Sequence, residues 1–425
     1  MNALPSPSET RRLLGQRSYL QFLAARFTAT IGVQMQTVTI GWQVYILARE
    51  GRDVKEAALI LSMIGLVQFV PVLCLTLLAG QMADHHDRKR IVMIALMVDV
   101  VAAATLAVLA HYNPMLWPIF VIAGVFGVSR AFMMPAAGST APMLVPRELM
   151  PRALAWNGLS WQTASIVGPM IGGVLIAISP THAYLASCSL YLVAIVLLSL
   201  IRDNTKPARH PGSRWEMVKE GVAYVWREKI VFGAISLDLF AVLLGGATLL
   251  LPIFAADVLK VGAEGFGLLR AGPGVGAAAI AIYLAFRPVK RQAGLVMFCG
   301  VAVFALATIL FGTAKSLTDW LGTPLLALPI SLFGLVVLGG ADMLSVYVRQ
   351  TLVQIVTPDA MRGRVTAVSS LFVGASNELG EFESGVVARF LGPVGAAVFG
   401  GVGALAVTGL WARLFPALRK ADRLM

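Results

Sequence analysis

Long apolar runs are the feature that most constrains how this chain can fold. A run of about 20 apolar residues allows a helix to cross the roughly 30 Å hydrocarbon layer of a bilayer. Twelve such runs occur, centred roughly on residues 33, 68, 101, 126, 166, 192, 244, 275, 303, 333, 376 and 405. Gly and Pro interrupt two of them, at 264–286 and 363–389. The sequence therefore predicts an all-α membrane protein with twelve transmembrane helices.

The composition agrees with a membrane protein. Hydrophobic residues make up 58% of the 425 residues and charged residues only 13%, against about a quarter in a typical soluble domain. The net charge of +12 comes from Lys and Arg scattered through short connectors, so no nucleic-acid binding is expected. The three cysteines lie singly in apolar runs, and no spacing of Cys or His predicts a metal site or a cofactor.

The distribution of Lys and Arg predicts the orientation, since cytoplasmic loops of membrane proteins are enriched in these residues. Of the 34 Lys and Arg residues, 25 lie in the two tails and in the connectors from even to odd spans. Five lie in the opposite connectors. Both termini are therefore predicted to face the cytoplasm.

The longest cytoplasmic connector divides the chain into two halves. The predicted parts are an N-terminal tail (1–18), a six-helix half (19–201), a linker (202–229), a second six-helix half (230–416) and a C-terminal tail (417–425). In the linker, Trp215, Val218, Val222 and Val225 recur at helical spacing among charged residues. This pattern predicts a short amphipathic helix that either lies on the membrane surface or packs on the helix bundle.

An offset of 212 residues aligns the two halves. It superimposes PRELMPRALAWNG (146–158) on PDAMRGRVTAVSS (358–370), and VGPMIGGVL (167–175) on LGEFESGVV (379–387). Two pseudo-symmetric six-helix halves of this kind resemble the major facilitator fold, in which substrate binds near mid-membrane between the halves.

Four charged residues inside the spans are related by the same offset, which pairs Arg26 with Asp238 and Arg130 with Asp342. A charge within a membrane helix costs several kcal/mol unless it faces a cavity or a partner. In the fold that the chain resembles, the first, fourth, seventh and tenth helices line the central cavity. The resemblance thus implies two cations on one wall and two carboxylates on the other. Structural ion pairs or polar bonds between helices are the alternative.

The stretch GQMADHHDRKR (80–90) resembles the signature loop of the major facilitator superfamily between the second and third helices. The matching residues are Gly80, Asp84, Arg88, Lys89 and Arg90. At His85 and Asp87 the chain departs from the usual Arg and Gly. The resemblance implies a gating latch, in which a carboxylate meets a helix N-terminus and an arginine pairs with an acid.

The stretch ASIVGPMIGG (164–173) resembles the Gly-Pro-x-x-Gly-Gly motif of antiporter branches of that superfamily. Its characteristic residues are Gly168, Pro169, Gly172 and Gly173. The resemblance implies a hinge used in gating and favours export. A face of small residues that lets two helices approach closely explains the glycines equally well.

Further stretches resemble the superfamily branch that contains the bacterial enterobactin exporter and macrolide-efflux proteins. They are SRAFMMPA (129–136), LVPRELMPRALAWNG (144–158), LLPIFAADVL (250–259) and PDAMRGRV (358–365). The resemblance implies a monomeric, proton-driven exporter of a small amphipathic organic molecule, a siderophore or a drug. It also implies a place in the bacterial inner membrane and no cofactor.

Three glutamates in NELGEFESG (377–385) stand out in an apolar run. Glu378 and Glu381 lie about 60° apart on one helical face, and Glu383 lies on the other side. Neighbouring carboxylates in a low-dielectric environment disfavour one another's charged form, so at least one of the first two is expected to hold a proton. Ion pairs or neutral acids bonding across helices are the alternatives, and Glu383 is assigned no coupling role.

The resulting hypothesis assigns proton coupling to Asp238 and Glu378, and secondarily to Glu381. Arg26 and Arg130 would attract anionic cargo or compete for these carboxylates, and Asp342 would line the cavity. Rival functions on the same scaffold are proton-coupled import of a nutrient and movement of a lysophospholipid between leaflets. No enzymatic activity is expected, and no Gly-x-x-x-x-Gly-Lys-Ser/Thr stretch for ATP phosphates occurs in the sequence.

Overall fold

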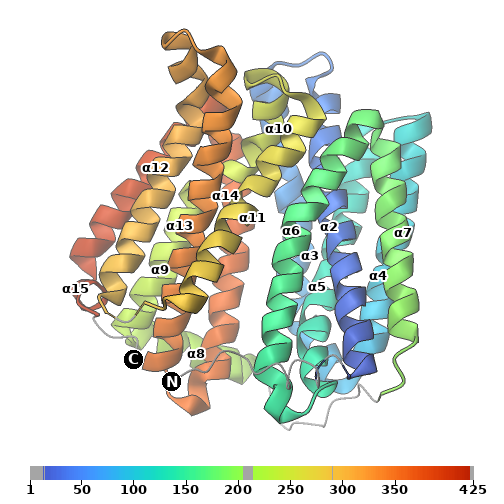
Figure 1. Ribbon diagram of the computed structural model, residues 1–425, viewed down its shortest axis with the longest axis vertical. Helices are drawn as coiled ribbons and strands as arrows, with labels where there is room; N and C mark the ends of the chain where they lie inside the picture. Colours follow the sequence, from blue (N-terminus) through green and yellow to red (C-terminus); the bar gives the residue numbers. More distant parts are fainter. Residues whose placement is uncertain (1–12, 14, 204–213, 290, 422–425) are drawn as a thin grey trace. The chain divides into compact units, whose positions relative to one another are not determined.

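The chain is helical through nearly all of the residues that the computed structural model describes, which are 13, 15–203, 214–289 and 291–421 (Figure 1). Ten helices in these ranges are long and apolar enough to span a membrane. Helix α2 (Arg17–Arg49) has 33 residues, about 50 Å at 1.5 Å per residue, and is more polar. Helix α14 (Asp359–Leu414) is broken at Gly392, where φ is 75°, so it provides two crossings. The all-α membrane fold is confirmed, and the helices are consistent with twelve crossings.

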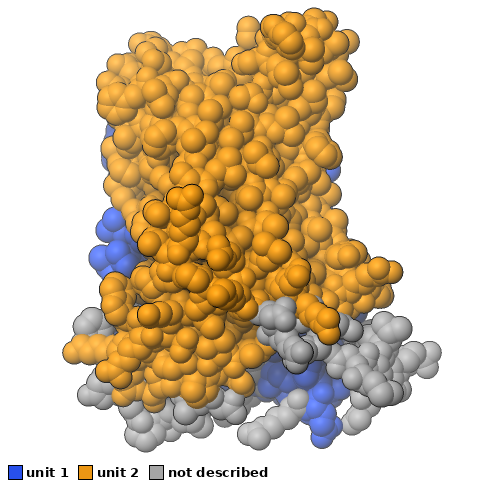
Figure 2. All heavy atoms as spheres, turned by 90° about the vertical axis from the view of Figure 1, so that its left-hand side faces the viewer, with its two compact units in different colours: residues 1–43, 67–211 blue, residues 44–66, 212–425 orange. Residues whose placement is uncertain are grey.

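The chain forms two compact units, coloured separately in Figure 2: residues 1–43 and 67–211 make unit 1, and residues 44–66 and 212–425 make unit 2. Unit 1 holds the larger parts of α2 and of α3 (Val54–His85). Its other elements are α4 (Arg88–Tyr112), α5 (Leu116–Thr140), η1 (Ala141–Met143), η2 (Arg147–Leu149), α6 (Met150–Ile178) and α7 (Pro180–Ser199).

Unit 2 contains the last turn of α2, the first half of α3 and the remaining helices. These are α8 (Arg214–Arg227), α9 (Lys229–Leu244), η3 (Ala247–Leu250), α10 (Leu251–Ile253), η4 (Phe254–Val258), α11 (Gly262–Phe286), α12 (Ala293–Trp320), η5 (Pro324–Leu326), α13 (Ala327–Val356), α14 and α15 (Pro416–Arg419). Most of the predicted N-terminal tail, residues 204–213 of the predicted linker and the last four residues of the C-terminal tail lie outside the described residues.

Two helix starts in unit 1 follow from local capping chemistry. The Asp87 carboxylate accepts a hydrogen bond from the backbone N–H of Lys89 at 3.0 Å and caps α4. At α7, the Ser179 hydroxyl accepts from the N–H of Thr181 at 3.2 Å, and Pro180 occupies the first helical position. Both residues satisfy N–H groups that have no partner within the helix.

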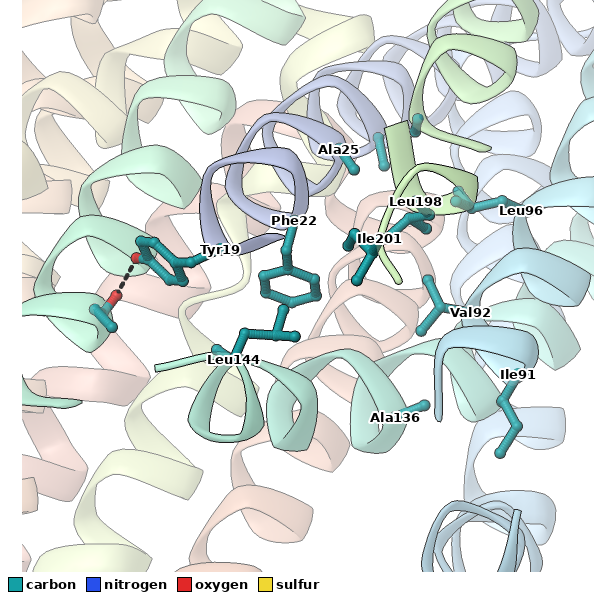
Figure 3. Packing of buried hydrophobic residues seen from close by; sticks show 14 of the residues in the cluster. Tyr19, Phe22, Ala25, Ile91, Val92, Leu96, Ala136, Leu144, Leu198 and Ile201 are labelled. Atoms are coloured by element: carbon teal, nitrogen blue, oxygen red, sulfur yellow. Dashed lines mark hydrogen bonds between the residues drawn. The ribbon is translucent and has the colours of Figure 1, made fainter. Parts of the chain in front are cut away.

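A buried cluster at one end of unit 1 fixes α2 against its neighbours. Phe22 packs with Leu144 and Ile201, as Figure 3 shows, and all three are buried. The Tyr19 hydroxyl donates to the carbonyl oxygen of Ala153 at 2.8 Å, which ties α2 to α6. The hydroxyl is thereby satisfied in an otherwise apolar interior.

The 212-residue repeat reappears in the packing of the glycine helices. A Cβ built on Gly168 would lie 2.7 Å from Cβ of Gln34, so α6 and α2 are in close contact. The equivalent residues of unit 2 are Gly380 and Gly246, and a Cβ built on Gly246 would lie 2.8 Å from the carbonyl carbon of Gly380. Each unit thus uses glycine where the same two helices meet.

Replacing Gly168 by alanine should lower the free energy of unfolding by about 1–3 kcal/mol, because the added methyl group overlaps Gln34. Gly158→Ala in the same helix is the matched control, since nothing lies within 4 Å of a Cβ at that position. It should be neutral or stabilising by up to about 1 kcal/mol. Thermal unfolding in detergent measures both variants, and equal unfolding temperatures would contradict the close packing.

The predicted linker helix is present as α8. Val225 is 4% exposed and packs in a cluster with Val231 and Val365, and Glu220 pairs with Arg364 of α14. Of the two alternatives, packing on the helix bundle is therefore the one that the structure shows.

Candidate functional site

Unit 2 contains a buried ion pair between α9 and α13. The Arg349 Nη2 lies 3.4 Å from Oδ2 of Asp238, and the two side chains are 3% and 5% exposed. A second guanidinium nitrogen, Nη1, donates to the hydroxyl of Ser369 on α14 at 3.0 Å. Three helices of unit 2 thus meet at one arginine.

Asp342 adds a second carboxylate to this cluster. It lies seven residues before Arg349 on α13, hence on the same helical face, and it is close enough to interact electrostatically with both Asp238 and Arg349. The carboxylates of Asp238 and Asp342 are called here the acidic pair. With the guanidinium of Arg349 they form a cluster of two negative charges and one positive charge. One bound proton would make it neutral.

Sequence reasoning found both carboxylates and missed the arginine. Arg349 was overlooked because the tenth span was centred at 333, whereas α13 extends over Ala327–Val356. A signal was present, since Arg349 lies at helical spacing from Asp342.

The structure describes the surroundings of the three glutamates of α14. All three side chains are half-buried. Thr248 of η3 donates to Oε1 of Glu381 at 3.4 Å, and a Cβ built on Gly65 would lie 3.5 Å from Oε2 of the same residue. Glu381 is thus held where α14 meets α3 and η3.

Unit 1 carries the predicted cations on two different helices. Arg130 of α5 donates to Oε1 of Gln68 at 3.2 Å. Arg26 of α2 is half-buried, and its guanidinium has no hydrogen bond or ion pair with the described residues. Tyr184 donates to Gln43 at 2.7 Å in the same unit. Arg130, Gln68 and Gln43 are thus engaged with other side chains, whereas Arg26 makes no such contact with the described residues.

The signature loop forms a local network at the junction of α3 and α4. Arg88 lies 4.0 Å from Asp84 and donates to the carbonyl of Ala83 at 3.1 Å. Arg90 lies 3.7 Å from Asp87, the residue that caps α4. Asp87, which stands where the family usually has glycine, therefore supplies a helix cap. Gly80, at the start of the loop motif, is buried.

The motif of α6 forms a packing face. Gly168, Pro169, Gly172 and Gly173 are all buried. A Cβ built on Gly172 would lie 3.5 Å from Cα of Met35, so this stripe abuts α2. The packing interpretation of these residues is confirmed, and a role in gating remains a prediction.

A second ion cluster in unit 2 was missed by sequence reasoning. Arg49 at the end of α2 contacts both carboxylate oxygens of Asp257 in η4, at 3.0 and 3.2 Å, and the Tyr45 hydroxyl donates to the same carboxylate. Nearby on α3, Glu56 lies 3.9 Å from Arg389 of α14. The cluster of Tyr45, Arg49 and Asp257 is called here the α2–η4 clasp.

These arrangements suit the binding of protons or charged organic molecules in a membrane interior. Buried carboxylates that share one arginine can exchange a proton without leaving an isolated charge.

Comparisons with known proteins agree with a membrane transporter. A family model described as "Transmembrane secretion effector" matches residues 14–424. The uncharacterized MFS-type transporter YfiS of Bacillus subtilis (strain 168) is 22% identical over 387 residues, covering 89% of this chain and 88% of its own. The enterobactin exporter EntS of Escherichia coli O127:H6 is 25% identical over 389 residues, covering 90% and 84%.

Solved structures show the fold alone, because their sequence identities are low. A POT family transporter in complex with 5-aminolevulinic acid has a TM-score of 0.73 at 12% identity, covering 95% of this chain and 96% of that chain. A D-xylose-proton symporter has a TM-score of 0.70 at 14% identity, covering 92% and 97%.

Proposed function

Because the chain belongs to the transmembrane secretion effector family of major facilitator transporters, we propose that it exports a small amphipathic organic molecule, a siderophore or a drug, in exchange for protons. It is a multi-pass membrane transporter and not an enzyme. The enterobactin exporter among its relatives supports export of a siderophore-like molecule. We place the chain in the bacterial inner membrane as a monomer, with both termini in the cytoplasm.

The acidic pair is the observation that carries proton coupling. Two carboxylates, Asp238 and Asp342, interact with the single guanidinium of Arg349. A second negative charge in this interior is costly, so the cluster binds a proton readily and gives it up when its surroundings become more polar. Glu378 on α14 is the second coupling residue that we propose, and Glu381 of the same helix is a secondary candidate.

The cations of unit 1 suit recognition of an anionic or electron-rich cargo. Arg26 is half-buried and has no ion pair with the described residues, which leaves its charge available to a ligand. Arg130 donates to the side-chain amide oxygen of Gln68 at 3.2 Å, a neutral acceptor. We assign gating to the signature loop and to the α6 glycine motif.

The test is efflux from liposomes containing the full chain under an imposed pH gradient, with enterobactin and a macrolide as probes. A coupling free energy of about 1–3 kcal/mol corresponds to about 5–150-fold. We therefore expect Asp238→Asn and Glu378→Gln to reduce gradient-driven efflux by a factor in this range. Asp203→Asn, an exposed carboxylate of the linker, is the matched control and should transport normally.

The proposal fails if Asp238→Asn and Glu378→Gln both retain the wild-type rate under the gradient. The runner-up is proton-coupled import, for which the fold similarity to a D-xylose-proton symporter speaks. Direction separates the two: with the chain inserted in a known orientation, an exporter moves cargo against the proton flow and an importer moves it along with the flow.

A further inference from the structure

One carboxyl group in unit 1 lies outside the machinery described so far. Asp99, near the middle of α4, is 0% exposed, and neither of its oxygens has a hydrogen-bond partner among the described residues. No other Asp, Glu, Lys or Arg occurs between residues 91 and 112. A residue so rare in this helix, and so completely buried, needs a physical explanation.

Helix α4 packs against α5 and α7, and polar groups from α5 adjoin Asp99. Ser129 and Arg130 are both close enough to interact with its carboxyl group. However, the Ser129 hydroxyl donates to the carbonyl of Ala95 at 3.0 Å, and Arg130 donates to Gln68 at 3.2 Å. Neither of these two hydrogen bonds is made to Asp99.

Two groups of α7 complete the surroundings of Asp99. Tyr191 is fully buried and close enough to interact with the carboxyl charge, but its hydroxyl donates to Oε1 of Gln36 at 3.0 Å. The Cys188 thiol is directed to the carbonyl of Val100 at 3.8 Å. Among the described residues, Asp99 is thus buried beside polar groups of α5 and α7, but neither of its carboxyl oxygens accepts a hydrogen bond.

An ionised carboxylate in such a place is far less stable than the neutral acid, so a buried group of this kind takes a proton. We propose that Asp99 is a proton-binding site in unit 1, distinct from the acidic pair of unit 2. It holds its proton in the packed arrangement and releases it when Arg130 leaves Gln68 and neutralises the carboxylate. As a coupling site, this inference rests on the proposed proton-driven transport.

The test uses infrared difference spectra of the full chain in liposomes between mildly acidic and mildly alkaline pH. The wild type should show the carbonyl stretch of a buried carboxylic acid, and Asp99→Asn should lose one such component while Asp203→Asn retains it. Asparagine resembles the neutral acid, so Asp99→Asn should unfold at the wild-type temperature. Asp99→Glu should restore the component at a shifted frequency.

Identical spectra of the wild type and Asp99→Asn would overturn the proposal. The proposal would also fail if Asp99→Asn did not fold and Asp99→Glu left the carbonyl signal unshifted. The signal would then not come from residue 99, whose carboxyl group would serve the structure alone. If the wild type shows no gradient-driven efflux, the proposed function fails while the spectra still decide the state of Asp99. If the wild type transports, Asp99→Asn should weaken the response to the pH gradient.

Discussion

Replacing Arg349 by glutamine should destabilise the protein by about 3–5 kcal/mol, because it leaves a buried carboxylate without its partner. The guanidinium lies 3.4 Å from Asp238 and both side chains are at most 5% exposed, so water cannot replace the lost interaction. Thermal unfolding in detergent measures the effect. The loss should be smaller at low pH, since a proton on Asp238 removes the orphaned charge, and should grow as the pH rises.

The double variant Asp238→Asn with Arg349→Gln separates the ion pair from the arginine itself. Removing both charges of a buried pair is often nearly neutral, and the remaining carboxyl of Asp342 can bind a proton and become neutral, so the double variant should recover most of the lost stability. Arg227→Gln, at the exposed end of α8, is the control and should change stability by less than about 0.5 kcal/mol. A double variant as unstable as the single one would show that the pair is not what Arg349 stabilises.

The helices could be predicted from the sequence because membrane-spanning helices need long apolar runs. α4, α11 and α12 lie where those runs predict them. Helix α2 was also predicted from the sequence. Gln34, Gln36 and Thr39 make it more polar than the other spans, but apolar residues still recur along it. The 212-residue repeat could also be read from the sequence, because glycine recurs at equivalent positions where helices touch.

The partners of charged residues could not be predicted in the same way. Asp238 and Asp342 were visible as rare charges, but which cation they meet depends on how α9 and α13 pack, and Arg349 was taken as part of a connector. Asp99 was a single acid in an apolar run, and its significance lies in the missing donors around it. Whether a buried acid lacks a hydrogen-bond donor can be seen only in the structure.

Asp257 was missed because it sits at the end of an apolar run, where a charge costs little in a membrane helix. The structure places it in η4, a single turn of π-helix, a deviation that often marks a functional position. Its partner Arg49 is about two hundred residues away in sequence. Sequence spacing does not link the two residues, because their contact depends on how the end of α2 packs within unit 2.

Replacing Asp257 by asparagine should shift the balance between access states by about 5–30-fold, or about 1–2 kcal/mol. The carboxylate accepts two hydrogen bonds from Arg49 and one from Tyr45, and such charge-assisted bonds are stronger than neutral ones. Arg49 is 33% exposed and Asp257 27%, so solvent screening keeps the effect below that of a buried pair. Because α2 runs from unit 1 into unit 2, we expect the α2–η4 clasp, which holds the end of this helix, to differ in strength between the access states of a transporter that rocks between them.

Reactivity of single cysteines placed at the ends of α2 and α11 toward a membrane-impermeant reagent would measure this shift. The charge-exchanged variant, Arg49→Asp with Asp257→Arg, should restore part of the wild-type reactivity because it restores the ion pair. Asp319→Asn breaks the exposed pair with Lys315 within α12 and is the matched control, expected to leave the reactivity unchanged. If Asp257→Asn behaves like this control, the clasp has no part in the access equilibrium, whereas rescue by charge exchange would tie the effect to the ion pair itself.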